Sequence, residues 1–170
     1  MSLKLYIMKK IINKLPIILI LFIFQFFKSQ NKERYENDYN KNVPKLQQIA
    51  LSKQTFYGEN FFELLSSIQS KGAKINNFSY RERGLSPKIY DVVLNFSDTD
   101  DFLIAEKKNY LRPYIIITFQ EQIPDELRQL TLKYHGELTQ EVKDFLANRK
   151  IEKIEFFGIN GLTSKDRSER

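Results

Sequence analysis

The chain has 170 residues, with 27 lysines and arginines, 21 aspartates and glutamates, and no cysteine. Residues 1–29 hold five of the lysines and none of the acids, which leaves 22 basic and 21 acidic residues in the remainder. Binding to nucleic-acid phosphates needs a real basic excess, so the near-neutral remainder removes the main argument for a nucleic-acid partner. Disulfides are excluded, and the core must hold without them.

Residues 1–29 have the layout of a secretory signal peptide. A tip with three lysines precedes an apolar block from Leu15 to Phe27, and the small residue Ser29 follows. The block is shorter than the roughly 20 apolar residues that span a bilayer. Phe27 fits the peptidase pocket poorly, so an uncleaved anchor stays open, and a membrane is expected only through such a leader. We expect an exported chain, periplasmic or extracellular.

Residues 30–161 are expected to form one domain, and 162–170 a polar tail. No internal repeat or Gly/Pro-rich linker divides this part of the chain. Residues 31–42 are very polar and predict a solvated helix or a flexible lead. Pro44 suits the first turn of a short amphipathic helix, which we expect to begin there.

The clearest helix pattern is the stretch NFFELLSSIQSKG, which begins at Asn60. Asn60 and Glu63 have the spacing of a capping box, and Gly72 suits the left-handed stop after the last turn. The apolar stripe follows the i, i+3, i+4, i+7 pattern of an amphipathic helix, with Phe61, Leu64, Leu65 and Ile68.

Two strands with a hairpin loop between them are expected next. Ile75–Tyr80 is a moderate strand pattern, and Ile89–Phe96 alternates clearly between apolar and polar residues. The intervening RERGLSPK contains glycine and proline, which are typical of a loop. Residues 102–109 are ambiguous and predict one or two helical turns.

The last part of the chain predicts two helices between two strands. Tyr114–Phe119 is apolar on both faces, which indicates a central strand. Pro124 and the two acids after it predict a helix that ends at Gly136, although alternation in LRQLTLKY leaves a strand open. A further helix begins at Thr139, and a strand covers Ile151–Phe157.

Hairpin-linked strands beside clustered helices predict an α+β fold. We expect a mainly antiparallel sheet of about four strands, with about three to four helices packed on it, behind the signal segment. A domain of this length buries roughly two thirds of its unfolded surface.

Few residues offer catalytic chemistry. His135 is the only histidine, and no GxSxG elbow is present, so we interpret it as a helix-end residue and keep catalysis as the alternative. One histidine without cysteine makes a zinc site untenable, and no cofactor is expected. Glycan cleavage needs two carboxylates about 5 to 9.5 Å apart, for which Glu121, after the central strand, is the least arbitrary candidate.

Three aspartates after the second strand are the remaining metal candidates. Asp98, Asp100 and Asp101 present carboxylates that favour calcium, but the stretch lacks the glycine and the distant glutamate of an EF-hand loop. We interpret them as a solvated turn, with Asp98 or Asp100 capping the next segment.

The hairpin loop carries the first candidate binding residues. Arg81 and Arg83 flank Glu82, and two arginines on a rigid hairpin suit an acidic partner or a phosphate. The alternative is a charged loop that only faces solvent.

Two pairs of adjacent phenylalanines supply the other candidates. One member of Phe61–Phe62 and one of Phe156–Phe157 must leave the regular buried face. We expect a second buried layer for these side chains. An exposed Phe62 or Phe157 indicates a partner surface instead.

These patterns favour an exported, non-catalytic protein that binds a protein partner in the cell envelope, in the manner of an inhibitor or immunity protein. The alternative is a small envelope hydrolase that uses paired carboxylates on glycan or peptidoglycan. A membrane-tethered domain that keeps its leader is the third hypothesis. The oligomeric state stays open.

Overall fold

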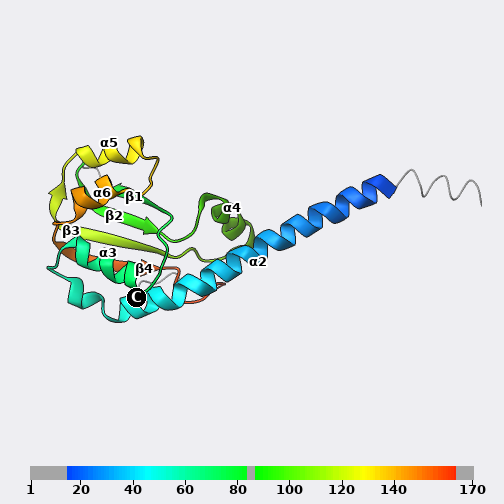
Figure 1. Ribbon diagram of the computed structural model, residues 1–170, viewed down its shortest axis with the longest axis horizontal. Coiled ribbons are helices and arrows are strands. Elements are labelled where there is room, and N and C mark those ends of the chain that lie inside the picture. The colour runs from blue at the N-terminus through cyan, green and yellow to red at the C-terminus, as the bar shows by residue number, and fades with distance from the viewer. Residues whose placement is uncertain (1–14, 84–86, 164–170) are drawn as a thin grey trace, which may run out of the picture.

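The computed structural model describes residues 15–83 and 87–163, with side chains from Glu33 onward. This part of the chain forms a four-stranded antiparallel sheet in the order β1-β2-β3-β4, with five α-helices and one 3-10 helix (Figure 1). The predicted α+β class is confirmed, with more helices than expected. The expected signal segment lies outside the described side chains, and most of the polar tail lies outside the described residues.

The four strands lie close to their predicted positions. Strand β1 spans Asn77–Glu82, β2 spans Ile89–Asn95, β3 spans Tyr114–Ile123 and β4 spans Ile151–Phe157. The prediction for β3 stopped at Phe119, where the register with β4 shifts. The strand continues beyond that shift because Ile123 pairs with Ile89 of β2.

Helix α2 spans Leu15–Leu51 without a break and contains Pro44. The prediction of Pro44 as a first-turn residue is therefore wrong, and the polar stretch before it is helical. Proline is tolerated here because its side is exposed, while the opposite side is packed on the domain. The buried stripe of α2 consists of Tyr35, Tyr39, Val43, Leu46 and Ile49. None of the helices in residues 15–83 and 87–163 is long and apolar enough to cross a bilayer.

The remaining helices are short. The 3-10 helix η1 spans Lys53–Phe56, α3 spans Phe61–Ser70, α4 spans Thr99–Lys108, α5 spans Glu126–Lys133 and α6 spans Gln140–Leu146. Figure 1 shows α4 beside α2, away from α5 and α6.

The start of α3 is stabilised differently from the prediction. Asn60 makes no side-chain capping bond, so the predicted capping box is wrong. Instead, the first amides of the helix donate to carbonyls just after α6: Phe61 N to Arg149 O at 2.9 Å, and Phe62 N to Ala147 O at 3.0 Å. These contacts satisfy donors that every helix start leaves open, and they join α3 to α6.

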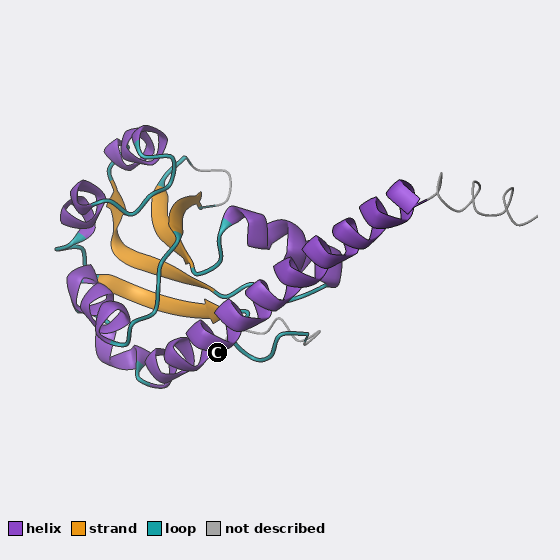
Figure 2. Cartoon of the chain, turned by 45° about the vertical axis from the view of Figure 1, so that its right-hand side comes forward, coloured by secondary structure: helices purple, strands orange, loops and turns teal. Residues whose placement is uncertain are grey.

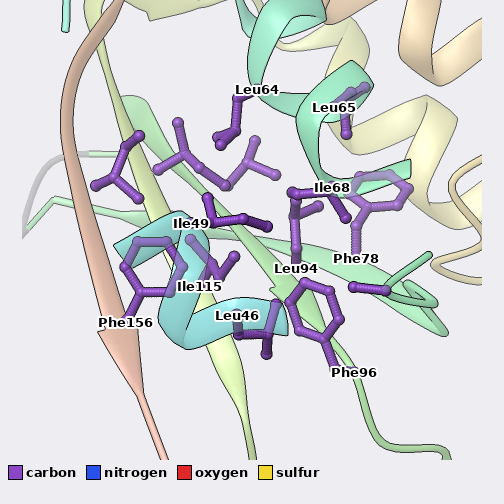
Figure 3. Packing of buried hydrophobic residues seen from close by; sticks show 14 of the residues in the cluster. Leu46, Ile49, Leu64, Leu65, Ile68, Phe78, Leu94, Phe96, Ile115 and Phe156 are labelled. Carbon is purple, nitrogen blue, oxygen red and sulfur yellow. The ribbon is translucent and has the colours of Figure 1, made fainter. Parts of the chain in front are cut away.

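Figure 2 shows most of the helices along one side of the sheet, and the core cluster joins their side chains to the strands. Side chains from α2, α3, α5 and α6 pack there against two aligned rows of strand residues. Figure 3 shows Leu46 and Ile49 of α2 with Phe156 and Ile115 of the sheet in this cluster. The two rows are Phe78, Leu94, Ile115 and Phe156, and Tyr80, Val92, Ile117 and Ile154.

Candidate binding site

The other side of the sheet, called the outer face here, presents three aligned rows of side chains. Because strand neighbours alternate between faces, residues paired across all four strands share one face. The rows are Asn77, Asn95, Tyr114 and Phe157; Ser79, Val93, Ile116 and Glu155; and Arg81, Asp91, Thr118 and Lys153.

The outer face has an apolar centre that does not belong to the core. Val93 is 8% exposed and Ile116 3% exposed, yet neither is a member of the core cluster. Every buried apolar side chain that the described helices contribute belongs to that cluster. In the described chain, Val93 and Ile116 are therefore buried apart from the core that the helices form with the sheet.

Polar pairs hold the surroundings of this centre in fixed positions. Thr118 Oγ1 donates to Asp91 Oδ1 at 2.8 Å, across β3 and β2. Asn95 Nδ2 donates to Asn77 Oδ1 at 2.8 Å, across β2 and β1. These two hydrogen bonds restrict the side chains that surround the apolar centre.

A pocket of about 310 Å³, called the aromatic pocket here, lies where the outer face meets α4. Tyr114 and Phe157 form one wall, with ring centroids 4.8 Å apart and planes inclined by 9°. Arg112 and Phe102 also line the pocket, and the guanidinium carbon of Arg112 lies 4.2 Å from the centroid of the Phe102 ring.

The backbone beneath the aromatic pocket is tightly fixed. Gly158 has φ +67°, and a Cβ at this position would lie 2.0 Å from the carbonyl oxygen of Arg112. Only glycine permits this approach, which sets the end of β4 against the start of β3. The hydroxyl of Tyr35 in α2 donates a hydrogen bond to Leu111 O at 2.6 Å, next to Arg112. Burial raises the pKa of Tyr35, which keeps the phenol a neutral donor.

Two of the four predicted binding residues, Arg81 and Phe157, lie on the outer face. The third, Arg83, lies over the ring of Tyr90 at 4.9 Å. Glu82 between the arginines pairs with Arg128 of α5, which also contacts the Pro87 carbonyl. Glu82 is therefore neutralised from the helix side, and Arg81 makes no ion pair within the described residues.

The fourth predicted binding residue, Phe62, is 57% exposed on α3, away from the outer face. The expected second buried layer is therefore wrong for Phe62. Phe157 is half-buried, because it stacks on Tyr114 on the side of the sheet opposite Phe156. The phenylalanine pairs thus divide between the core and two separate surfaces.

His135 follows α5 in the left-handed conformation, with φ +50°, and its side chain is exposed. The next residue explains its position, because Phe78 N of the edge strand β1 donates to Gly136 O at 2.7 Å. Among the described residues, the imidazole of His135 has no hydrogen-bond partner, and no serine hydroxyl is bonded to it. His135 occupies the end of a helix, as the sequence indicated.

Glu121 lines a second pocket of about 320 Å³, together with Asp144 and Arg149. Arg149 lies over the ring of Phe145 at 5.0 Å, and its Nε is buried without a hydrogen-bond partner. Burial lowers the pKa of Arg149, while the nearby Glu121 carboxylate opposes that shift. Glu121 lies within β3 and not after it, so its expected place beyond the strand is wrong, although it does line this pocket, which is called the acidic pocket here after Glu121 and Asp144.

The three aspartates proposed for calcium serve the start of α4. Asp98 accepts from Asp101 N at 2.8 Å, and Asp101 Oδ2 accepts from Asp98 N at 3.3 Å, which completes a capping box. Asp101 also pairs with Arg34, while Asp100 is exposed in the first turn. Among the described residues, no group of three or more acidic, histidine or cysteine side chains is arranged to hold a metal ion.

Sequence reasoning missed Arg112, Phe102 and Tyr114. Tyr114 carried a signal, because alternation from Ile115 places it on the face opposite the core. Arg112 and Phe102 carried none, since their contact joins two segments with no shared periodicity.

No family model, curated protein or solved structure matches this chain. The fold itself defines the class, an α+β domain with one helix-covered sheet face and one outer face with a pocket at its end.

Proposed function

We propose that the chain is an exported, non-catalytic domain that binds a protein partner in the cell envelope through the outer face, in the manner of an inhibitor or immunity protein. The observation that supports this best is the apolar centre of that face, where Val93 and Ile116 lie outside the core cluster. A partner that moves aside the groups covering Val93 and Ile116 would complete an apolar centre inside a polar rim, which is the usual anatomy of a protein interface.

The charges at the rim favour an acidic partner. Arg81 stands at one corner of the outer face, and its neighbour Glu82 is already engaged by Arg128. Arg112 lies in the pocket at the other end of the face, and no carboxylate of the described chain pairs with it. A partner with carboxylates at both ends of its contact surface matches these two arginines.

The test compares capture of one envelope protein by the purified domain and by four variants. Ile116→Lys and Arg81→Glu change the outer face, and both are expected to lower capture at least tenfold. Phe62→Lys and Leu132→Lys remove apolar side chains that are 57% and 70% exposed on α3 and α5, and both should retain capture. Loss with Phe62→Lys alone would move the interface to α3 and overturn the proposal.

The second candidate function is the envelope hydrolase, because Glu121 and Asp144 line one pocket. Its lining is mostly charged and polar, whereas a catalytic general acid usually sits in an apolar environment that keeps it protonated. Activity on peptidoglycan and glycan substrates that disappears in Glu121→Gln and in Asp144→Asn, and persists in Glu137→Gln, would establish it. Activity that all three variants retain would remove the acidic pocket from consideration.

A further inference from the structure

We propose that the aromatic pocket binds a carboxylate attached to an apolar group of aromatic size, with Arg112 as the carboxylate receptor. The inference names the chemistry that the partner brings to one end of the outer face, and it therefore rests on the proposed function. The aromatic pocket is small enough for its ligand chemistry to be tested with single compounds.

The first argument is the geometry of Arg112. Its guanidinium lies over the Phe102 ring at 4.2 Å, a contact that uses the planar face of the cation. The N–H donors of a guanidinium lie in its plane and match the two oxygens of a carboxylate. Arg112 forms no ion pair or side-chain hydrogen bond with any described residue, so this donor set is available.

The second argument is the shape of the walls. The stacked pair of Tyr114 and Phe157 provides a flat aromatic surface, and Ala105 and Gly158 are the small residues of the lining. A volume of about 310 Å³ is at the low end for small-molecule sites, which span about 300 to 1,000 Å³. The pocket therefore suits one side chain with its carboxylate better than an extended ligand.

The third argument is the charge at the rim. Glu106 also lines the pocket, and among the described residues it is the only acidic one in the lining. A phosphate carries close to two negative charges at neutral pH and is repelled more strongly by Glu106 than a carboxylate with a single charge. With one arginine and one glutamate, the described lining has no excess positive charge to compensate the desolvation of a dianion, so it suits a monoanion better than a phosphate.

Two sources carry this chemistry: the last residue of a polypeptide, with its free carboxylate, or an acidic side chain beside an aromatic residue within a chain. Three probes separate them. N-acetylphenylalanine has the free carboxylate, N-acetylphenylalaninamide lacks it, and N-acetylglutamylphenylalaninamide carries the carboxylate on the neighbouring side chain. Each is titrated into the isotope-labelled protein, and the NMR signals of the Arg112 Nε–H and of the Phe157 and Gly158 amides are followed.

We expect N-acetylphenylalanine to shift these signals. Its amide should bind at least about tenfold more weakly, as is usual when a charged hydrogen bond is lost. Arg112→Gln should weaken the binding of N-acetylphenylalanine by the same factor. Arg112→Lys should restore only part of this affinity, because an ammonium group lacks the planar arrangement of donors. Glu106→Gln should strengthen binding of the carboxylate and leave the amide unchanged. Arg112 is exposed, so these variants are expected to fold.

The relative affinity of the third probe assigns the source: affinity equal to that of N-acetylphenylalanine indicates an internal acidic side chain, and weak binding indicates a chain end. Equal binding of the carboxylate and the amide, shifts that persist in Arg112→Gln, or no shifts at the solubility limit of all three probes overturns the inference. If Ile116→Lys abolishes partner capture while Arg112→Gln does not, the proposed function stands and the pocket inference falls. If the carboxylate probe binds through Arg112 but Ile116→Lys leaves capture intact, the proposed surface falls alone.

Discussion

The guanidinium of Arg34 in α2 lies 3.2 Å from the carboxylate of Asp101 in α4, across 67 residues of chain. Asp101 is buried, and its side chain is only 3% exposed, while that of Arg34 is 44% exposed. Burial raises the pKa of Asp101 above its ordinary value, and Arg34 opposes part of that rise. Helix α4, which forms one side of the aromatic pocket, is thus held to α2 by a contact that depends on pH.

Arg34→Gln is expected to cost about 1 to 3 kcal/mol of unfolding free energy at about pH 7, since it leaves a buried carboxylate without its cation. A carboxyl with a raised folded-state pKa loses stability as pH rises from its unfolded value through its folded value. The cost should therefore shrink well below pH 3.8, the ordinary value for an aspartate, where Asp101 is protonated in both the folded and the unfolded state. Urea denaturation at both pH values measures this difference.

Lys45→Gln provides the matched control for Arg34→Gln. Lys45 also joins α2 to the domain, but its Nζ donates to the Gly72 carbonyl at 2.7 Å and not to an acid. Its loss should have the same small cost at both pH values. An equal cost of Arg34→Gln at both pH values would show that Asp101 does not couple to this contact.

Gly158→Ala should destabilise the domain by more than about 3 kcal/mol, because the new Cβ would meet the Arg112 carbonyl and the backbone has φ +67°. Gly58→Ala isolates the cost of the backbone conformation, since Gly58 has φ +79° and a Cβ at that position would meet nothing within 4 Å. That variant should lose about 1 to 2 kcal/mol. Thermal unfolding compares the two, and equal losses would mean that the chain relaxes around Gly158 without harm to the pocket.

Ile116→Lys and Ile117→Lys test which side of β3 carries the core. On the outer face, a lysine extends its stem over neighbouring side chains and reaches water, at a cost of about 1 to 2 kcal/mol. Ile117 is fully buried in the core cluster, and a lysine there should prevent stable folding. Circular dichroism and urea titration distinguish a folded from an unfolded variant. Similar unfolding of both would show that the outer face is covered.

A chain that begins at Gln30 keeps every side chain of α2 whose contacts are described, from Arg34 onward, and it should fold as a stable domain. A chain that begins at Lys41 lacks Tyr35 and Tyr39, and loss of two buried aromatics should cost at least about 6 kcal/mol. Denaturant unfolding checks both chains. The mass of the protein from its native source separately decides processing: a start at Gln30 or Asn31 indicates cleavage, and an intact leader indicates a tether.

The strands were predictable because their signal is local. In β2 and β4, alternation identifies the face that packs on the core, and in β3 the unbroken apolar run reflects burial of Ile115 and Ile116 on opposite sides. The stripe of α3 is equally local.

Helix α2 was missed in part because its buried stripe begins with tyrosines inside a polar stretch. Tyr35 and Tyr39 bury their rings and pass their hydroxyl hydrogens to Leu111 O and Gly158 O, partners that no local pattern reveals. Helix α4 was ambiguous because its pattern of burial is opposite to the polarity of its residues. It buries Asp101 while Phe102 is 41% exposed, and Asp101 is held there by the capping box with Asp98 and by the ion pair with Arg34 of α2.

The candidate site was predictable only in fragments. Arg81 and Phe157 were chosen for separate reasons, and the sheet register places them on one face. That register depends on pairings between segments far apart in the chain, which composition and spacing do not encode. Arg112 belongs to the site through a contact with Phe102 that exists only after α4 has folded back on the sheet.

The hydroxyl of Tyr39 donates to Gly158 O, and the amide of Gln47 donates to Ile159 O, so the first described helix and the segment after the last strand hold one another. A ribosome-bound or partly translocated fragment that ends before β4 therefore lacks both the acceptors for α2 and the final strand of the sheet. Such a fragment cannot complete the hydrophobic core, so folding requires that nearly the whole chain has been synthesised or translocated. If the chain is exported as proposed, this dependence keeps it unfolded until translocation is nearly complete.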